Sequence, residues 1–116
     1  MMYYVKQYAT YPPLTATLYQ ADGSLLSLED ATAVYFTMRP KSKVAKQDAI
    51  RGTCTIIDVD GVKKVRYTWA AGDTDNPGVY VAEFLVVRPS GNQIVPNRSY
   101  NEIEILTALD EMPPVE

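Results

Sequence analysis

The chain has 116 residues, enough for one domain and too few for two independent hydrophobic cores. Hydrophobic residues make up 47% and charged residues 22%, which is typical of a folded globular protein rather than a disordered one. The formal net charge of -3 argues against a nucleic-acid partner, because phosphate binding requires an excess of Lys and Arg. No apolar run approaches the roughly 20 residues of a membrane-spanning helix, so no membrane partner is expected.

The chain contains one cysteine, Cys54, and no histidine. An intramolecular disulfide is therefore excluded, and the commonest general base and metal ligand is missing. We expect no catalytic residues, no enzymatic activity, no cofactor and no metal. Four aspartates are explained more simply by their preference for turns than by calcium binding: Asp58, Asp60, Asp73 and Asp75.

The first half of the chain contains two alternating segments. Residues 14–19 alternate apolar and polar side chains, the period of two that predicts a strand with one buried face. Residues 32–39 repeat the pattern, and Pro40 ends it because proline cannot donate to a strand ladder. The Asp-Gly turn at residues 21–24 separates the two segments.

The second half begins with the sequence signal of a β-hairpin. Residues 52–59 and 62–69 are rich in β-branched and aromatic side chains, and Asp60-Gly61 joins them. A long strand is expected over residues 78–88, and shorter strands follow. The predicted fold is an all-β, immunoglobulin-like antiparallel β-sandwich of about seven strands.

A possible tyrosine corner supports this fold. Tyr80 follows a polar corner and lies near the start of the long strand, where immunoglobulin-like sandwiches place a tyrosine whose hydroxyl returns to the backbone. The alternative is that Tyr80 is only a core aromatic. Ala82 stands where antibody domains keep a cysteine, so packing would replace the disulfide. We assign Trp69, Phe36 and Phe84 to the core with Tyr80.

Two stretches carry an ordered series of motifs. The first contains PLTATLYQADGS and TAVYFTMR, and the second contains VRYTW, GDT and PGVYVAEF. Together they resemble the immunoglobulin-like N-terminal domain of phage baseplate upper proteins, a family of tailed-phage and prophage structural proteins. The resemblance covers about residues 13–106. It implies a virion protein, made in the host bacterial cytoplasm, whose partners are other phage structural proteins in a symmetric multi-copy assembly. Baseplate, tail, neck and head-surface positions are all left open.

We divide the chain into an N-terminal arm or edge strand at residues 1–12, the sandwich at 13–107 and an extended acidic, proline-containing tail at 108–116. Tyrosine is common in interface cores, and four tyrosines lie in the first segment: Tyr3, Tyr4, Tyr8 and Tyr11. An arm or edge strand that pairs with a neighbouring subunit is one interpretation, and the other is that Tyr3 to Tyr8 form the first strand of the sandwich itself. If it is an arm, deleting residues 1–11 should prevent incorporation into the particle and leave the domain folded.

A local cluster of basic residues follows the second strand, and it is either a solvated loop or a docking surface for an acidic neighbour: Arg39, Lys41, Lys43 and Lys46. The alternative function is a carbohydrate-binding β-sandwich that contributes to host-surface adhesion through weak glycan contact. Trp69 or exposed tyrosines would stack on the sugar. Strand alternation places Trp69 in the core instead, which favours the structural function.

Overall fold

The computed structural model describes residues 2–20, 22–41, 49–96 and 101–109. Within these ranges every regular element is a strand, so the predicted all-β class is confirmed. The strands are β1 (Met2–Lys6), β2 (Leu14–Ala16), β3 (Ala33–Pro40), β4 (Ile50–Val59), β5 (Val62–Tyr67), β6 (Gly78–Arg88), β7 (Gly91–Val95) and β8 (Asn101–Leu106).

The strands form one eight-stranded sheet in the order β1-β8-β6-β3-β4-β5-β2, and β7 also pairs with β6. One side of β6 pairs with β3. The other side is shared by β7, which pairs with residues 84–88 of β6, and β8, which pairs with residues 78–82. The pair of β1 and β8 is parallel, whereas the other strand pairs of the described sheet are antiparallel. No hairpin joins these two strands, and nothing local forces them to run in opposite directions.

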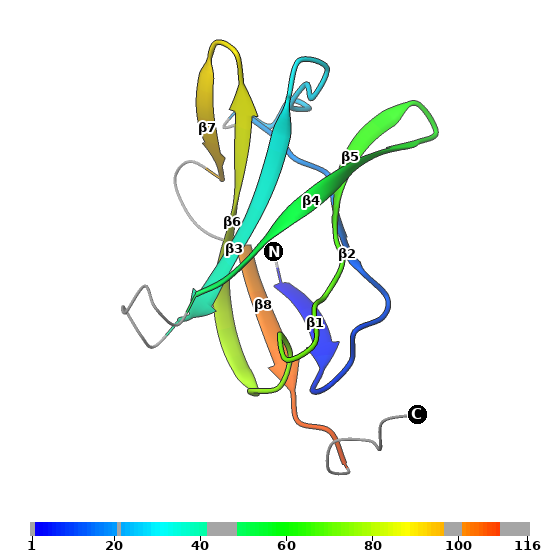
Figure 1. The fold of residues 1–116 in the computed structure, drawn as a ribbon, viewed down its shortest axis with the longest axis vertical. Coiled ribbons are helices and arrows are strands. Elements are labelled where there is room, and N and C mark those ends of the chain that lie inside the picture. Colours follow the sequence, from blue (N-terminus) through cyan, green and yellow to red (C-terminus); the bar gives the residue numbers. More distant parts are fainter. Residues whose placement is uncertain (1, 21, 42–48, 97–100, 110–116) are drawn as a thin grey trace.

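The long strand β4 makes the sheet curl. Its residues 50–54 pair with β3, whereas residues 55–59 pair with β5. The ladder therefore changes partner halfway along the strand, and the sheet curls into a half-barrel around the core (Figure 1). The predicted hairpin between β4 and β5 is present, with positive φ angles of 52° at Asp60 and 81° at Gly61. The side chain of Asp58 accepts a hydrogen bond from the Gly61 amide at 3.0 Å.

Four aromatic rings fill the centre of the core. The ring of Phe36 stacks on Tyr67 with centroids 4.6 Å apart and meets Trp69 edge-on at 6.1 Å. The ring of Phe84 also packs against the Phe36 ring, with the two centroids 5.5 Å apart. Phe36, Trp69, Tyr80 and Phe84, which the sequence assigns to the core, are all buried.

The absence of a side chain at Gly52 allows this packing. Gly52 lies opposite Phe36 in the ladder between β3 and β4. A Cβ atom at this position would lie 2.2 Å from Cε1 of Tyr67, far inside van der Waals contact. The Tyr67 ring therefore crosses β4 over a glycine and reaches Phe36.

We expect the Gly52→Ala substitution to lower the free energy of unfolding by roughly 1–3 kcal/mol, because the Tyr67 ring must leave its site. The change is measured as a lower urea midpoint at an unchanged denaturant slope. Thr53→Ala is the matched control, since the Thr53 side chain is exposed on the same strand. Equal midpoints for the wild-type chain and Gly52→Ala would contradict the close approach of Tyr67.

The N-terminal segment is built into the fold as β1. Its residues 2–6 pair with residues 102–106 of β8, and Val5 is buried. The Gln7 amide nitrogen Nε2 donates to the Asp75 carbonyl at 2.9 Å, and its Oε1 accepts from the Ala108 amide at 3.2 Å. The hydroxyl of Thr74 donates to the Ala9 carbonyl at 2.9 Å. This segment therefore pairs within the chain, as the strand at one end of the sheet.

Candidate protein-interaction surface

A row of apolar side chains crosses the outer face of the sheet. Tyr35 on β3 lies opposite Leu85 on β6, and Leu85 lies opposite Ile94 on β7. Tyr35 is 42% exposed and Ile94 is 49% exposed, with Leu85 half-buried between them. We call these three residues the apolar row. They face outward because their strand neighbours point into the core.

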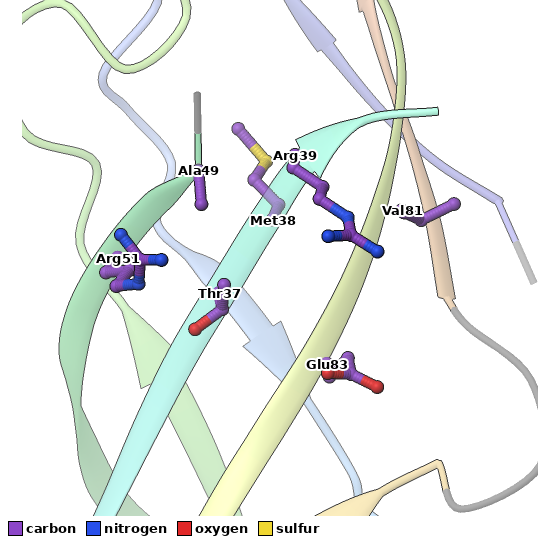
Figure 2. Close-up of a pocket in the computed structure, with 7 residues that line it drawn as sticks. All are labelled: Thr37, Met38, Arg39, Ala49, Arg51, Val81 and Glu83. Atoms are coloured by element: carbon purple, nitrogen blue, oxygen red, sulfur yellow. The ribbon is translucent and has the colours of Figure 1, made fainter. Parts of the chain in front are cut away.

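The next row on the same face is charged. Thr37 on β3 lies between Arg51 on β4 and Glu83 on β6 in the strand ladders. Figure 2 shows these side chains on one face, with Arg39 extending from β3 toward β6. They border a hollow of about 320 Å³ whose lining is Thr37, Met38, Arg39, Ala49, Arg51, Val81 and Glu83. Charges of both signs therefore border the apolar row.

The predicted basic cluster does not form a purely positive surface in the part that the structure describes. Lys41 Nζ lies 2.6 Å from Glu102 Oε2, and Arg39 lines the mixed-charge hollow. The ion pair of Lys41 is exposed to solvent, so it contributes about 0–1 kcal/mol at most. Lys43 and Lys46 lie outside the described residues.

The four N-terminal tyrosines do not share one environment. Tyr3 packs partly buried against the core, whereas Tyr4, the next residue on β1, points outward and is 58% exposed. Tyr8 is half-buried and has a positive φ of 71°, and Tyr11 is 81% exposed. Tyr4 and Tyr11 are therefore the two that are available to a partner.

Tyr3 packs partly buried against the core, to which the buried Trp69 belongs. Burial raises the pKa of Tyr3, and the neighbouring indole of Trp69 opposes part of that shift. Trp69 Nε1 is buried without a hydrogen-bond partner among the described residues, so Tyr3 and Trp69 do not form a hydrogen bond. Because Trp69 is buried and Tyr3 packs partly buried against the core, neither side chain is free to form an aromatic platform.

A second hollow, of about 470 Å³, opens between β2 and the part of the sheet formed by β1, β6 and β8. Leu14, Phe36 and Ile103 contribute to its apolar wall, and Tyr3 lies at its side. Pro96 and Asn101 also line it, and residues 97–100 between them are not described. We assign no site to this hollow.

The aspartates weighed as calcium ligands hold turns. Asp73 Oδ2 accepts hydrogen bonds from the Tyr67 hydroxyl at 2.5 Å and from the Ala70 amide at 2.8 Å. Asp58 binds the Gly61 amide and lies 3.9 Å from Lys63 Nζ. Within the described ranges, no three His, Cys, Asp or Glu side chains are grouped as a metal site.

Cys54 is a buried free thiol on β4. Burial raises its pKa to about 12, so the thiol stays protonated near neutral pH. Since the thiolate is the nucleophilic form, Cys54 is unreactive in this position. It packs as a small apolar side chain against the core.

Because Tyr67, Tyr80 and the Cys54 thiol are buried, we expect the folded chain to lose stability at alkaline pH. Burial raises the pKa of Tyr67, and its hydrogen bond to Asp73 raises it further; burial also raises the pKa of Tyr80. The unfolded chain therefore loses these protons at lower pH than the folded chain does. The stabilisation from Cys54 is complete below pH 9.0 and is lost as the pH rises toward about 12, and the stabilisation from the two tyrosines begins to decline above pH 10.0.

This expectation is measured as the free energy of urea unfolding across that alkaline range. In the Tyr67→Phe variant we expect a shallower decline above pH about 10, because one of the titrating groups is gone. Tyr4→Phe is the matched control, since the Tyr4 side chain is exposed. A free energy independent of pH in the wild-type chain would contradict the burial of these groups.

No protein-family model matches the chain, and no curated protein matches it. Across the described residues, no helix is long and apolar enough to cross a membrane. The class is therefore defined by the fold itself, an all-β domain whose sheet curls into a half-barrel. The apolar row with its charged border is our candidate surface for contact with another protein.

Sequence patterns alone do not predict the apolar row. Alternation along residues 32–39 and 78–88 already implies that Tyr35 and Leu85 lie opposite the buried face of their strands. The pairing of β3, β6 and β7 then brings Tyr35, Leu85 and Ile94 into one row. That pairing is not apparent from any one segment of sequence.

Proposed function

We propose that the chain is an immunoglobulin-like, non-enzymatic structural or adaptor protein of a bacteriophage virion that acts by protein-protein assembly. It is made in the host bacterial cytoplasm and serves in the baseplate, tail, neck or head surface. Its partners are other phage structural proteins in a symmetric multi-copy assembly. The single observation that carries the assembly function is the apolar row, because exposed apolar side chains lie together on a sheet face with charges at their border.

The strand order supports the immunoglobulin-like part of the proposal. In immunoglobulin sandwiches one sheet contains strands G, F and C, and the other contains D, E and B. Here β8, β6 and β3 are adjacent in that order, and so are the second half of β4, β5 and β2. In this interpretation the two sheets of the sandwich join at the point where β4 changes its pairing partner from β3 to β5.

Tyr80 supports the same assignment. Its hydroxyl donates a hydrogen bond of 2.7 Å to the carbonyl of Asn76, four residues upstream. This is the hydrogen bond expected of a tyrosine corner at the start of strand F. Ala82, two residues later, is buried where antibody domains keep their second cysteine. The phage origin rests on the motif resemblance over residues 13–106.

The carbohydrate-binding alternative has less support. Trp69 is 3% exposed and meets Phe36 and Tyr67 edge-on, so it offers no free face for a sugar. Tyr4 and Tyr11 are exposed, but no observation assembles them into a platform. A glycan array is expected to give no hits with the purified chain.

The virion assignment is tested by complementation. A phage or prophage lacking this chain is supplied with the wild-type protein, and the particles are purified and analysed by mass spectrometry. We expect the chain at a fixed ratio to the other virion proteins. Its absence from particles, in cells that express it, would exclude the virion function.

The contribution of the apolar row is tested with the same particles. Tyr35→Glu places a charge in the row and is expected to lower incorporation at least about tenfold. Leu25→Glu is the matched control, because Leu25 is also exposed but lies outside the row. Equal incorporation of the two variants would show that another surface binds the particle.

A further inference from the structure

The strand β7 has an open side. In the described part of the chain β7 pairs with β6 alone, while β1 and β2 form the two ends of the sheet. Edge strands expose unpaired backbone N–H and C=O groups that can accept another strand. Figure 1 shows the β6–β7 hairpin at the end of the molecule opposite the end at which β1 and β8 finish.

The composition of β7 differs from that of the other two edges. Natural edge strands are commonly protected by charged side chains, by proline or by being very short. β1 carries Lys6, and β2 has only three residues. β7 has five residues, GNQIV, with no charge and no proline. Pro89 and Pro96 lie outside its bounds and leave its own ladder groups intact.

The surroundings of β7 are compatible with a close neighbour. Arg88 adjoins the turn of the hairpin, and its Nη1 lies 2.5 Å from Asp30 Oδ1. This cation is therefore neutralised by its own chain. Ile94 points to the outer face from the middle of the edge and ends the apolar row. A neighbouring strand would cover Ile94 and meet no charged side chain on β7 itself.

We propose that two copies of the chain pair through their β7 strands, antiparallel to each other, to form one continuous sheet across a two-fold axis. An antiparallel strand pair is self-complementary, so one edge serves both copies. Because β7 is uncharged, the symmetry brings no like charges together along the strand. The apolar rows of the two copies then meet at Ile94. This inference names a partner for the proposed assembly function and rests on it.

The test is sedimentation equilibrium of the full, purified chain over a range of concentrations. We expect a reversible dimer whose dissociation constant rises at least about tenfold in Ile94→Lys, since lysine on an edge strand blocks strand addition. Leu25→Lys is the matched control, because Leu25 is 47% exposed and lies outside β7. Its dissociation constant should equal that of the wild type. A wild-type monomer at all concentrations, or equal dimerisation of Ile94→Lys, would overturn the proposal.

Amide hydrogen exchange gives a second readout that needs no variant. Exchange in Gly91–Val95 should slow as the wild-type concentration rises, and exchange in β1 should not change. Slowing in β1 alone would assign the contact to the other edge and reject β7. A chain found in particles but monomeric in solution rejects the β7 dimer only. A dimer whose chain never enters particles rejects the virion function only.

Discussion

Replacing Phe36 with alanine is expected to lower the free energy of unfolding by about 3–5 kcal/mol. Phe36 is completely buried, and three other aromatic rings contact it. The substitution leaves a cavity in the middle of a ring cluster contributed by β3, β5, β6 and the residue Trp69.

Urea unfolding measures this loss through the fluorescence of Trp69, the single tryptophan of the chain. In Phe36→Ala the folded emission should also move toward longer wavelength, because the indole gains access to solvent. Tyr35→Ala is the matched control, since Tyr35 is the preceding residue and points outward. We expect it to cost about 1 kcal/mol or less. Similar losses for the two variants would contradict the central position of Phe36.

Deleting residues 1–11 is expected to abolish cooperative folding. This reverses the expectation for a detachable arm, because β1 covers part of the core. The deletion removes all five residue pairs between β1 and β8, together with the buried Val5. It also removes Gln7, which binds both the Asp75 carbonyl and the Ala108 amide. The effect exceeds that of any single hydrogen bond or side chain.

Thermal unfolding followed by circular dichroism measures this effect. The truncated chain should show no sharp transition, and Val5→Asp should reproduce much of the loss because it buries an unpaired charge. Tyr4→Asp is the matched control, since Tyr4 is the adjacent residue and faces solvent. A truncated chain that melts as sharply as the wild type would restore the interpretation of the segment as an arm.

Local sequence patterns predicted the strands and turns that depend mainly on residues close together in the sequence. Alternation identified the strands β3 and β6, and Asp60-Gly61 identified the hairpin between β4 and β5. The end of the first predicted strand was less accurate: β2 stops at Ala16, because residues 14–16 alone are paired with β5. Ladder partners, which lie far away in sequence, decide such boundaries.

Contacts between distant segments could not be predicted. The parallel pairing of β1 with β8 joins residues about 100 positions apart, and no periodicity encodes it. The need for glycine at position 52 depends on where the Tyr67 ring crosses β4. The apolar row likewise depends on the registers of three strands. In each case the deciding quantity is the register between strands, which a single segment does not contain.

The parallel direction of β1 and β8 has a mechanical consequence. Met2 lies beside Glu102 at one end of the pair, and Lys6 lies beside Leu106 at the other. Tension applied between the beginning of β1 and the end of β8 therefore runs along the strands. The bonds of the ladder share that load and must break together rather than one after another. A domain tethered at both ends would resist stretching far better than the same ladder peeled from one end.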